Sequence, residues 1–123
     1  MKNNTDITSK NLSLTENVGI NITSKDRKLT EGIESKILQE VTKLEKLAKG
    51  NKHVKVVLSE KAGNNKTEIM ININGRFLKS QAVSENLFES IELASENIKG
   101  QLVKYSEKKN SNNKEWWLIS LMF

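Results

Sequence analysis

The stretch Ile20–Leu47, INITSKDRKLTEGIESKILQEVTKLEKL, contains a strand pattern and a helix pattern joined by a basic loop. Apolar residues first recur at every second position, as in a strand with one buried face; they are Val18, Ile20 and Ile22. After the loop they recur at every third or fourth position, which places them on one face of a helix; they are Ile33, Ile37, Val41, Leu44 and Ala48. This order predicts a strand followed by an amphipathic helix.

Both ends of this helix carry residues that commonly begin and end helices. The hydroxyl of Thr30 can accept a hydrogen bond from a free backbone N–H, and the acidic residues Glu31 and Glu34 suit the positive end of a helix. Gly50 can end the helix, because glycine tolerates the positive φ of many helix termini. We therefore expect a helix from about Thr30 to Gly50.

The N-terminal segment repeats part of this unit, since residues 6–17 match residues 21–32 with seven identities in twelve positions. The first copy has the same Leu-Thr-Glu sequence at Leu14–Glu16, but Val18 and Gly19 follow it in place of a helical pattern. Residues 1–17 also contain too few apolar side chains to offset the entropy of ordering them. We expect a flexible N-terminal arm over residues 1–17, with Lys10 as a candidate phosphate contact.

The middle of the chain predicts a meander of three strands. Apolar residues occupy every second position in Val54–Leu58 and again in Ile69–Ile73. The turn-forming residues 62–65 lie between these two ranges. Asn74–Gly75 is a strong signal for a tight turn, because both residues tolerate positive φ, and Arg76–Val83 follows as the next strand.

A second, longer helix is predicted after Ser84, which can cap it, and it continues to about Lys109. The element order β-α-β-β-β-α predicts an α+β fold, with a four-stranded sheet and two helices on one face, like a double-stranded-RNA-binding domain. If the first two strands are neighbours, they run parallel through a right-handed crossover. We expect residues 18–109 to form this domain and residues 110–123 to form a polar linker and an apolar tail.

Composition limits the class of protein. The chain has 123 residues, enough for one domain, and its net charge of +5 favours polyanions or acidic protein and membrane surfaces as partners. It has no cysteine for disulfide or thiolate chemistry, and its N-terminus lacks the apolar run of a signal peptide. Its apolar stretches are far shorter than the ~20 residues that span a bilayer. We expect a cytoplasmic protein that does not cross a membrane.

Nothing in the sequence indicates catalysis or a metal site. His53 is the only histidine, and no second or third soft ligand accompanies it. Four carboxylates of the second helix lie on one exposed stripe, where their pKa values are not driven apart as acid–base catalysis requires; they are Glu85, Glu89, Glu92 and Glu96. No phosphate-binding loop or nucleophile elbow is present. We expect no enzymatic activity, no cofactor and no bound metal.

Basic residues are better organised than acidic ones. They form a stripe on the first helix, a cluster in the loop before it and most of the end of the second helix: Lys36, Lys43 and Lys46; Lys25, Arg27 and Lys28; Lys99, Lys104, Lys108 and Lys109. Two interpretations remain open. Cations near a helix C-terminus complement its dipole by ~0.3–1 kcal/mol each, or these residues form a surface for a polyanion. Because aromatic residues are few, phosphate contact fits better than base stacking.

Three segments carry a resemblance to a known family, and its most specific residues are Asn21–Lys25, Lys43–Lys46 and Leu87-Phe88 with Ile91. Together with the predicted hairpins, they resemble the ribosome hibernation-promoting factor family, which includes ribosome-associated inhibitor A. The resemblance implies the β-α-β-β-β-α fold and a translation inhibitor without catalysis. The resemblance also implies the partner, which is the whole ribosome. Such a protein contacts rRNA of the small ribosomal subunit, in the channel that messenger RNA and the A-site and P-site tRNAs would otherwise occupy.

The resemblance also implies which side chains face rRNA. Matched positions and neighbouring basic residues give the expected set: Lys25, Arg27, Lys28, Lys36, Lys43, Lys46, Arg76, Lys79, Lys99, Lys104, Lys108 and Lys109. The chain departs from the family pattern at Asn86, Phe88, Gly100 and Val103, where relatives commonly have Asp, Tyr and basic residues. Its length resembles the short members of the family.

The C-terminal sequence EWWLISLMF, Glu115–Phe123, is unusually apolar. Such a segment can add a strand to a sheet edge, dock on its own domain or promote aggregation. The alternative function is therefore a small protein-interaction or dimerisation module, in which self-association or protein contact uses Trp116–Phe123 and the open face of the sheet.

Overall fold

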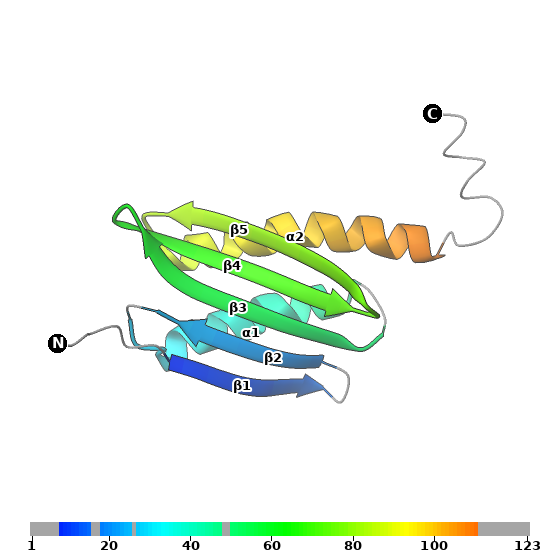
Figure 1. The fold of residues 1–123 in the computed structure, drawn as a ribbon, viewed down its shortest axis with the longest axis horizontal. Helices are drawn as coiled ribbons and strands as arrows, with labels where there is room; N and C mark the ends of the chain where they lie inside the picture. The colour runs from blue at the N-terminus through cyan, green and yellow to red at the C-terminus, as the bar shows by residue number, and fades with distance from the viewer. Residues whose placement is uncertain (1–7, 16–17, 26, 48–49, 111–123) are drawn as a thin grey trace.

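The computed structural model describes residues 8–15, 18–25, 27–47 and 50–110, which form a five-stranded sheet covered on one face by two helices (Figure 1). The elements, in chain order, are β1 (Thr8–Thr15), β2 (Val18–Ser24), α1 (Glu31–Glu45), β3 (Lys52–Lys61), β4 (Asn64–Ile73), β5 (Arg76–Ser84) and α2 (Leu87–Asn110). The α+β class and the expected order from β2 onward are confirmed.

The strands lie side by side in the order of the sequence, β1-β2-β3-β4-β5. Strands β2 and β3 are parallel and are connected through α1, as expected for the first two predicted strands, whereas all other neighbours are antiparallel. Ala62-Gly63 and Asn74-Gly75 form the two tight turns of the meander, and all four residues have positive φ. The predicted turn chemistry therefore accounts for the Asn74-Gly75 hairpin, whereas Ala62 adopts a positive φ that is uncommon for alanine.

Strand β1 corrects the expected strand number from four to five. Its residues fall in the segment expected to be a flexible arm, yet they pair antiparallel with β2 from Thr8, opposite Ser24, to Thr15, opposite Val18. Leu12 and Leu14 pack partly buried against the core. Backbone pairing with the edge of β2 and this packing offset the ordering entropy that isolated side chains could not. The sheet thus differs from a four-stranded, double-stranded-RNA-binding-domain-like sheet by an added edge strand.

The helix ends agree only partly with the sequence. The hydroxyl of Thr30 accepts a hydrogen bond from the backbone N–H of Ile33, as predicted, but α1 ends at Glu45 with Lys46 as its C-cap, before Gly50. Helix α2 is capped by Asn86 rather than by Ser84, because the Asn86 side-chain oxygen accepts from the N–H of Glu89 at 3.1 Å. Asparagine is as good an N-cap as serine. The backbone carbonyl of Asn86 also accepts a hydrogen bond from the N–H of Ser90, as the first turn of a helix requires.

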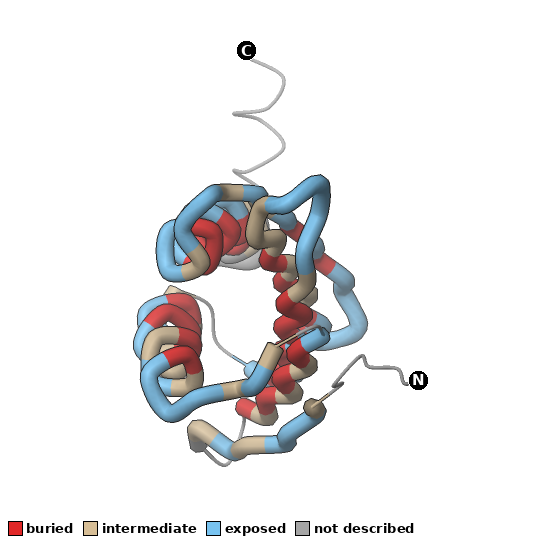
Figure 2. The backbone as a smooth tube through the Cα atoms, turned by 90° about the vertical axis from the view of Figure 1, so that its left-hand side faces the viewer, coloured by how far each residue is buried: buried red, intermediate tan, exposed pale blue. Residues whose placement is uncertain are grey.

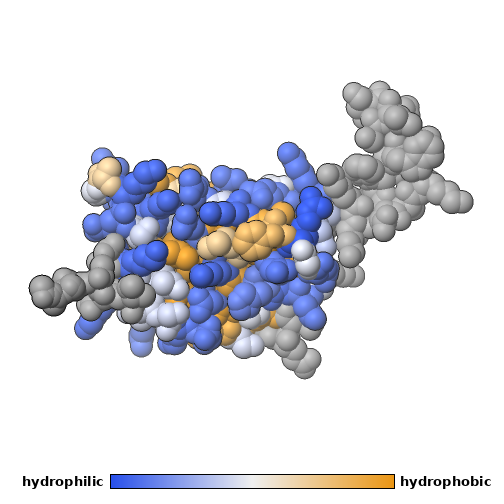
Figure 3. Space-filling model, in the orientation of Figure 1, coloured by the Kyte–Doolittle hydropathy of each residue, from blue (hydrophilic) through white to orange (hydrophobic). Residues whose placement is uncertain are grey.

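The core lies between the helices and one face of the sheet. Figure 2 shows both helices on the same side, with buried positions of helices and sheet turned toward each other. Isoleucines dominate it: Ile20, Ile22, Ile37, Ile69, Ile71, Ile73, Ile91 and Ile98 are almost fully buried. Within the described residues no element covers the opposite sheet face, which we call the open sheet face, and Figure 3 shows apolar residues gathered on it among hydrophilic ones. The helix layer and the open sheet face are therefore two distinct surfaces.

Candidate nucleic-acid interface

The two helices meet along a line of charged and polar side chains, which we call the interhelical seam and define as Lys36, Glu40, Lys43, Glu92 and Ser95. Lys36 joins both helices, because its ammonium nitrogen lies 3.3 Å from Glu40 on α1 and 2.5 Å from Glu92 on α2. Lys99 follows Ser95 by four residues on the same stripe of α2, but it is exposed and lies beyond these contacts. The seam is therefore an ordered network rather than a row of free lysines.

Glu40 is the buried centre of the seam. Its side chain is only 6% exposed, and its carboxylate lies 3.3 Å from Lys36 and 3.2 Å from Lys43. Burial raises the pKa of Glu40, but hydrogen bonds from Ser95, Lys43 and Lys36 outweigh it and hold the pKa below its ordinary value. The hydrogen bond to Glu92 raises the pKa of Lys36 against the opposing effect of burial, and Glu40 raises it further. Both groups are charged at neutral pH.

The predicted rRNA-facing residues of the helices therefore divide into paired and unpaired groups. Lys36 is 14% exposed and held by two carboxylates, so it faces the seam and not solvent. Lys43 is 61% exposed, and Glu40 is its one ion-pair partner among the described residues. Lys46, Lys99 and Lys104 are exposed, and within the described part of the chain none of them takes part in an ion pair.

These exposed cations lie toward one end of the helix layer. Both helices run in the same direction, so their C-terminal halves lie at the same end of the molecule (Figure 1). Arg76, at the start of β5, also reaches this end, where its guanidinium carbon lies 6.0 Å from the centre of the Tyr105 ring. We call this group the basic end and define it as Lys43, Lys46, Arg76, Lys99 and Lys104.

A shallow groove marks the β5 side of the basic end. Arg76, Lys104 and Tyr105 line it together with Leu78 and Gln101, and the groove encloses about 200 Å³. The phenol oxygen of Tyr105 accepts a hydrogen bond from the side chain of Asn74, which fixes the ring against the β4–β5 turn. Two cations beside a fixed aromatic ring can bind a phosphate and stack on a base.

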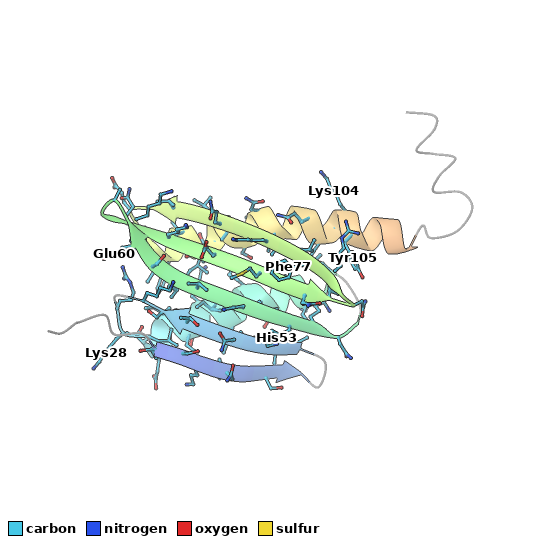
Figure 4. All side chains as sticks on the ribbon, in the orientation of Figure 1. Lys28, His53, Glu60, Phe77, Lys104 and Tyr105 are labelled. Atoms are coloured by element: carbon cyan, nitrogen blue, oxygen red, sulfur yellow. The ribbon has the colours of Figure 1, made fainter. Side chains whose placement is uncertain are left out.

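The loop cations lie at the opposite end of the molecule, as the positions of Lys28 and Lys104 in Figure 4 show. Lys25 and Lys28 are exposed. Arg27 is half-buried and joins the loop to the β3–β4 hairpin, with Glu60 at 3.8 Å and a hydrogen bond to Asn65. Arg27 thus has a structural role in this loop, whereas Lys25 and Lys28 form no ion pair with any residue that the structure describes.

The remaining predicted residues lie apart from both groups. Lys79 points from the open sheet face, opposite Met70 in the pairing of β4 with β5. Lys10, the candidate contact of the expected arm, pairs with Glu34 of α1 at 3.0 Å. Lys108 and Lys109 belong to the last turn of α2, but their side chains, like the tail Trp116–Phe123, lie outside the described residues.

Sequence reasoning missed the role of Glu40, which the stripe of basic residues obscured. The available signal was its spacing, because Glu40 is four residues after Lys36 and three before Lys43, and such neighbours meet on a helix. The contacts of Lys36 with Glu92 and of Glu40 with Ser95 depend on helix packing, which the sequence pattern did not reveal.

A model of the family described as Sigma 54 modulation protein / S30EA ribosomal protein matches residues 20–110, which is most of the chain. The chain belongs to this family. The match confirms the resemblance to ribosome hibernation-promoting factors, and it begins after β1, so the added edge strand lies outside the matched range. A search of curated proteins finds no match.

Solved structures share the fold. The crystal structure of the Thermus thermophilus Protein Y N-terminal domain matches with a TM-score of 0.63 and 22% identity, over 70% of this chain and 93% of that one. A ribosomal subunit interface protein from Coxiella burnetii matches with a TM-score of 0.64 and 13% identity, over 72% of this chain and 98% of that one. In this chain, no helix of the described segments has the length and apolar character to cross a membrane.

Proposed function

We propose that this chain is a cytoplasmic ribosome hibernation factor that binds rRNA of the small ribosomal subunit through the basic end. Bound in the channel of messenger RNA and the A-site and P-site tRNAs, it blocks initiation on idle ribosomes and protects them. Family membership supports ribosome binding. The single structural observation that carries the RNA contact is that Lys46, Lys99 and Lys104 are exposed and unpaired within the described part of the chain.

The proposed footprint differs from the residues expected from the sequence. The basic end supplies the main phosphate contacts, and Lys25 and Lys28 supply outer contacts from the other end of the same molecule. Lys36 and Arg27 support the surface without facing the RNA, because carboxylates already hold them. Lys79 lies on the open sheet face, outside the footprint.

Co-sedimentation with purified small ribosomal subunits tests the proposal. The protein should pellet with the subunits at low salt, and prebound messenger RNA with initiator tRNA should prevent this. If about six phosphates are neutralised, the plot of log affinity against log salt should have a slope of roughly −4 to −5. A protein that stays in the supernatant at low salt would contradict the proposal.

A matched pair of double variants locates the footprint. Lys46→Glu with Lys99→Glu should weaken binding at least ten-fold and reduce the magnitude of the salt slope by about 2, because two phosphate contacts are lost. Lys55→Glu with Lys79→Glu makes the same change in net charge on the open sheet face, where both lysines are exposed. The control pair should bind nearly as the wild type does, and equal losses in both pairs would indicate a net-charge effect only.

The second candidate function is a protein-interaction or dimerisation module. Phe77 favours it, because this aromatic side chain on the open sheet face is 62% exposed. A module of this kind would lose its partner when Phe77 is changed to Ser and keep it in the Lys46→Glu, Lys99→Glu variant. The hibernation factor should show the reverse pattern with ribosomal subunits.

A further inference from the structure

The open sheet face carries a diagonal band of apolar side chains, which we call the sheet-face band and define as Val57, Met70 and Phe77. Val57 lies opposite Glu68, two residues before Met70, and Met70 lies opposite Lys79, two residues after Phe77. Diagonal neighbours of this kind in adjacent strands are about 7–8 Å apart, within reach of long and aromatic side chains. Figure 3 shows apolar atoms in a continuous band over these strands.

The band is shielded at one end and open at the other. Val57, on the central strand, is only 6% exposed, whereas Phe77, on the edge strand β5, is 62% exposed. Lys55 and Lys79 flank Met70 across the sheet, so the band has a charged border. An apolar surface with a polar rim is typical of a site that another segment covers.

The end of α2 lies close to the open end of the band. Arg76, next to Phe77, lies 6.0 Å from the Tyr105 ring, and α2 continues only five residues beyond Tyr105, to Asn110. Those five residues add about 7.5 Å of helix. In Figure 1 this end of α2 extends past the β4–β5 turn, so no strand separates it from the open face.

The chain beyond α2 has the length and composition to cover the band. Residues 111–115 are polar and can span up to about 17 Å when extended. Trp116–Phe123 follow, with two tryptophans and mostly aliphatic residues, and would extend about 27 Å as a strand. The linker can therefore return from Asn110 to Phe77, and the apolar part is nearly as long as β5.

We propose that Trp116–Phe123 docks on the sheet-face band of its own chain, with the indole rings over Phe77 and Met70. Aromatic pairs and contacts of methionine sulfur with aromatic rings both favour this arrangement. Docking covers the open sheet face and leaves the helix layer free for RNA. The inference is independent of the proposed function, because it concerns the opposite face of the molecule and its test needs no ribosome.

Intrinsic fluorescence tests the docking directly, because both tryptophans of the chain, Trp116 and Trp117, lie in the tail. In the full chain, emission should be shifted to the blue and acrylamide quenching should be several-fold weaker than for the free peptide of residues 111–123. Phe77→Ser should shift emission to the red and restore strong quenching. Emission and quenching in the full chain equal to those of the free peptide would overturn the proposal.

A matched control uses Phe88, the second exposed phenylalanine among the described residues. Phe88 is 45% exposed but lies on α2, in the helix layer, so Phe88→Ser should leave emission and quenching unchanged. Met70→Gln should reproduce the effect of Phe77→Ser, and circular dichroism checks that each variant is folded. If Phe77→Ser and Met70→Gln both leave the signal of the wild type, the tail docks elsewhere and the proposal is wrong.

Dilution separates docking within one chain from docking on a second copy. Blue-shifted emission should persist from high to low micromolar protein concentration, and sedimentation should show a monomer throughout. A red shift on dilution that accompanies dissociation of a dimer would make the second copy the occupant and overturn the intramolecular proposal.

Discussion

The ammonium nitrogen of Lys36 on α1 lies 2.5 Å from a carboxylate oxygen of Glu92 on α2, and this contact joins the two helices across the seam. A lysine that sequence comparison implies to face rRNA is thereby placed in a structural network. The distinction matters for mutagenesis, because a change at Lys36 affects the helix packing that orients the exposed lysines. Stability and ribosome affinity must be measured together in every variant.

We predict that Lys36→Met mainly lowers stability, whereas Lys46→Met mainly weakens ribosome binding. Lys36→Met should lower the free energy of unfolding by about 1–3 kcal/mol, because it removes one partner of the buried Glu40 carboxylate. Lys46→Met should change it by no more than ~0.5 kcal/mol, because Lys46 is exposed, yet weaken ribosome binding. Urea denaturation and co-sedimentation measure the two quantities. Weaker binding by Lys36→Met than by Lys46→Met, in protein as stable as the wild type, would place Lys36 in the footprint.

The pKa of Glu40 predicts a pH dependence of stability. Because the pKa is lower in the folded protein than in the unfolded chain, the carboxylate contributes stability that is complete above the unfolded pKa and is lost as pH falls through the folded pKa. The pKa of Lys36 is raised, so its contribution is complete below the unfolded lysine pKa and is lost as pH rises through the folded value. Together they should give a plateau between about pH 5 and pH 10.

Glu40→Gln tests the acid limb of this curve. The variant should be less stable at neutral pH by about 1–3 kcal/mol, and its stability should fall less steeply than that of the wild type below about pH 5. Urea denaturation at a series of pH values gives both curves. Parallel curves would show that the Glu40 carboxylate has the same pKa in the folded and unfolded states.

Gly100 offers a gain of both stability and affinity. An added Cβ at this exposed position in α2 meets no atom within 4 Å. Gly100→Ala should therefore stabilise the protein by about 0.5–1 kcal/mol, because glycine weakens a helix interior. Gly100→Lys should give a similar gain and also tighten ribosome binding, since it adds a cation next to Lys99 in the basic end. Equal binding by the two variants would place this position outside the RNA contact.

Strand β1 should stabilise the domain without contributing to RNA binding. Deletion of residues 1–15 exposes the edge of β2 and removes Leu12 and Leu14 from the core, so the free energy of unfolding should fall by about 2–4 kcal/mol. Ribosome affinity should remain within two-fold, because β1 lies at the opposite edge of the sheet from β5. Leu12→Ser with Leu14→Ser in the full chain separates the loss of packing from the exposure of the edge. A large loss of affinity in folded protein would assign an RNA contact to residues 1–15.

The sequence by itself determined the elements whose signals are local. The alternation of Val18, Ile20 and Ile22 gave β2, the Thr30 cap and the helical spacing gave α1, and Asn74-Gly75 gave the turn before β5. These patterns depend on neighbouring residues and on the period of the backbone, so they can be interpreted without knowledge of the fold. The family match, over residues 20–110, includes most of β2, all of α1 and the Asn74-Gly75 turn.

Only the tertiary structure decided the features that depend on distant partners. The few apolar residues of β1 gave a weak signal, and pairing with the β2 edge made it a strand. The sequence could not show that Lys36 is held in an ion pair while Lys99 is exposed. Lys36 lies on α1 and its partner Glu92 lies on α2, so the pair exists only where the two helices pack. Whether a cation is available to a phosphate depends on what the fold packs beside it, and residue type and spacing do not contain that information.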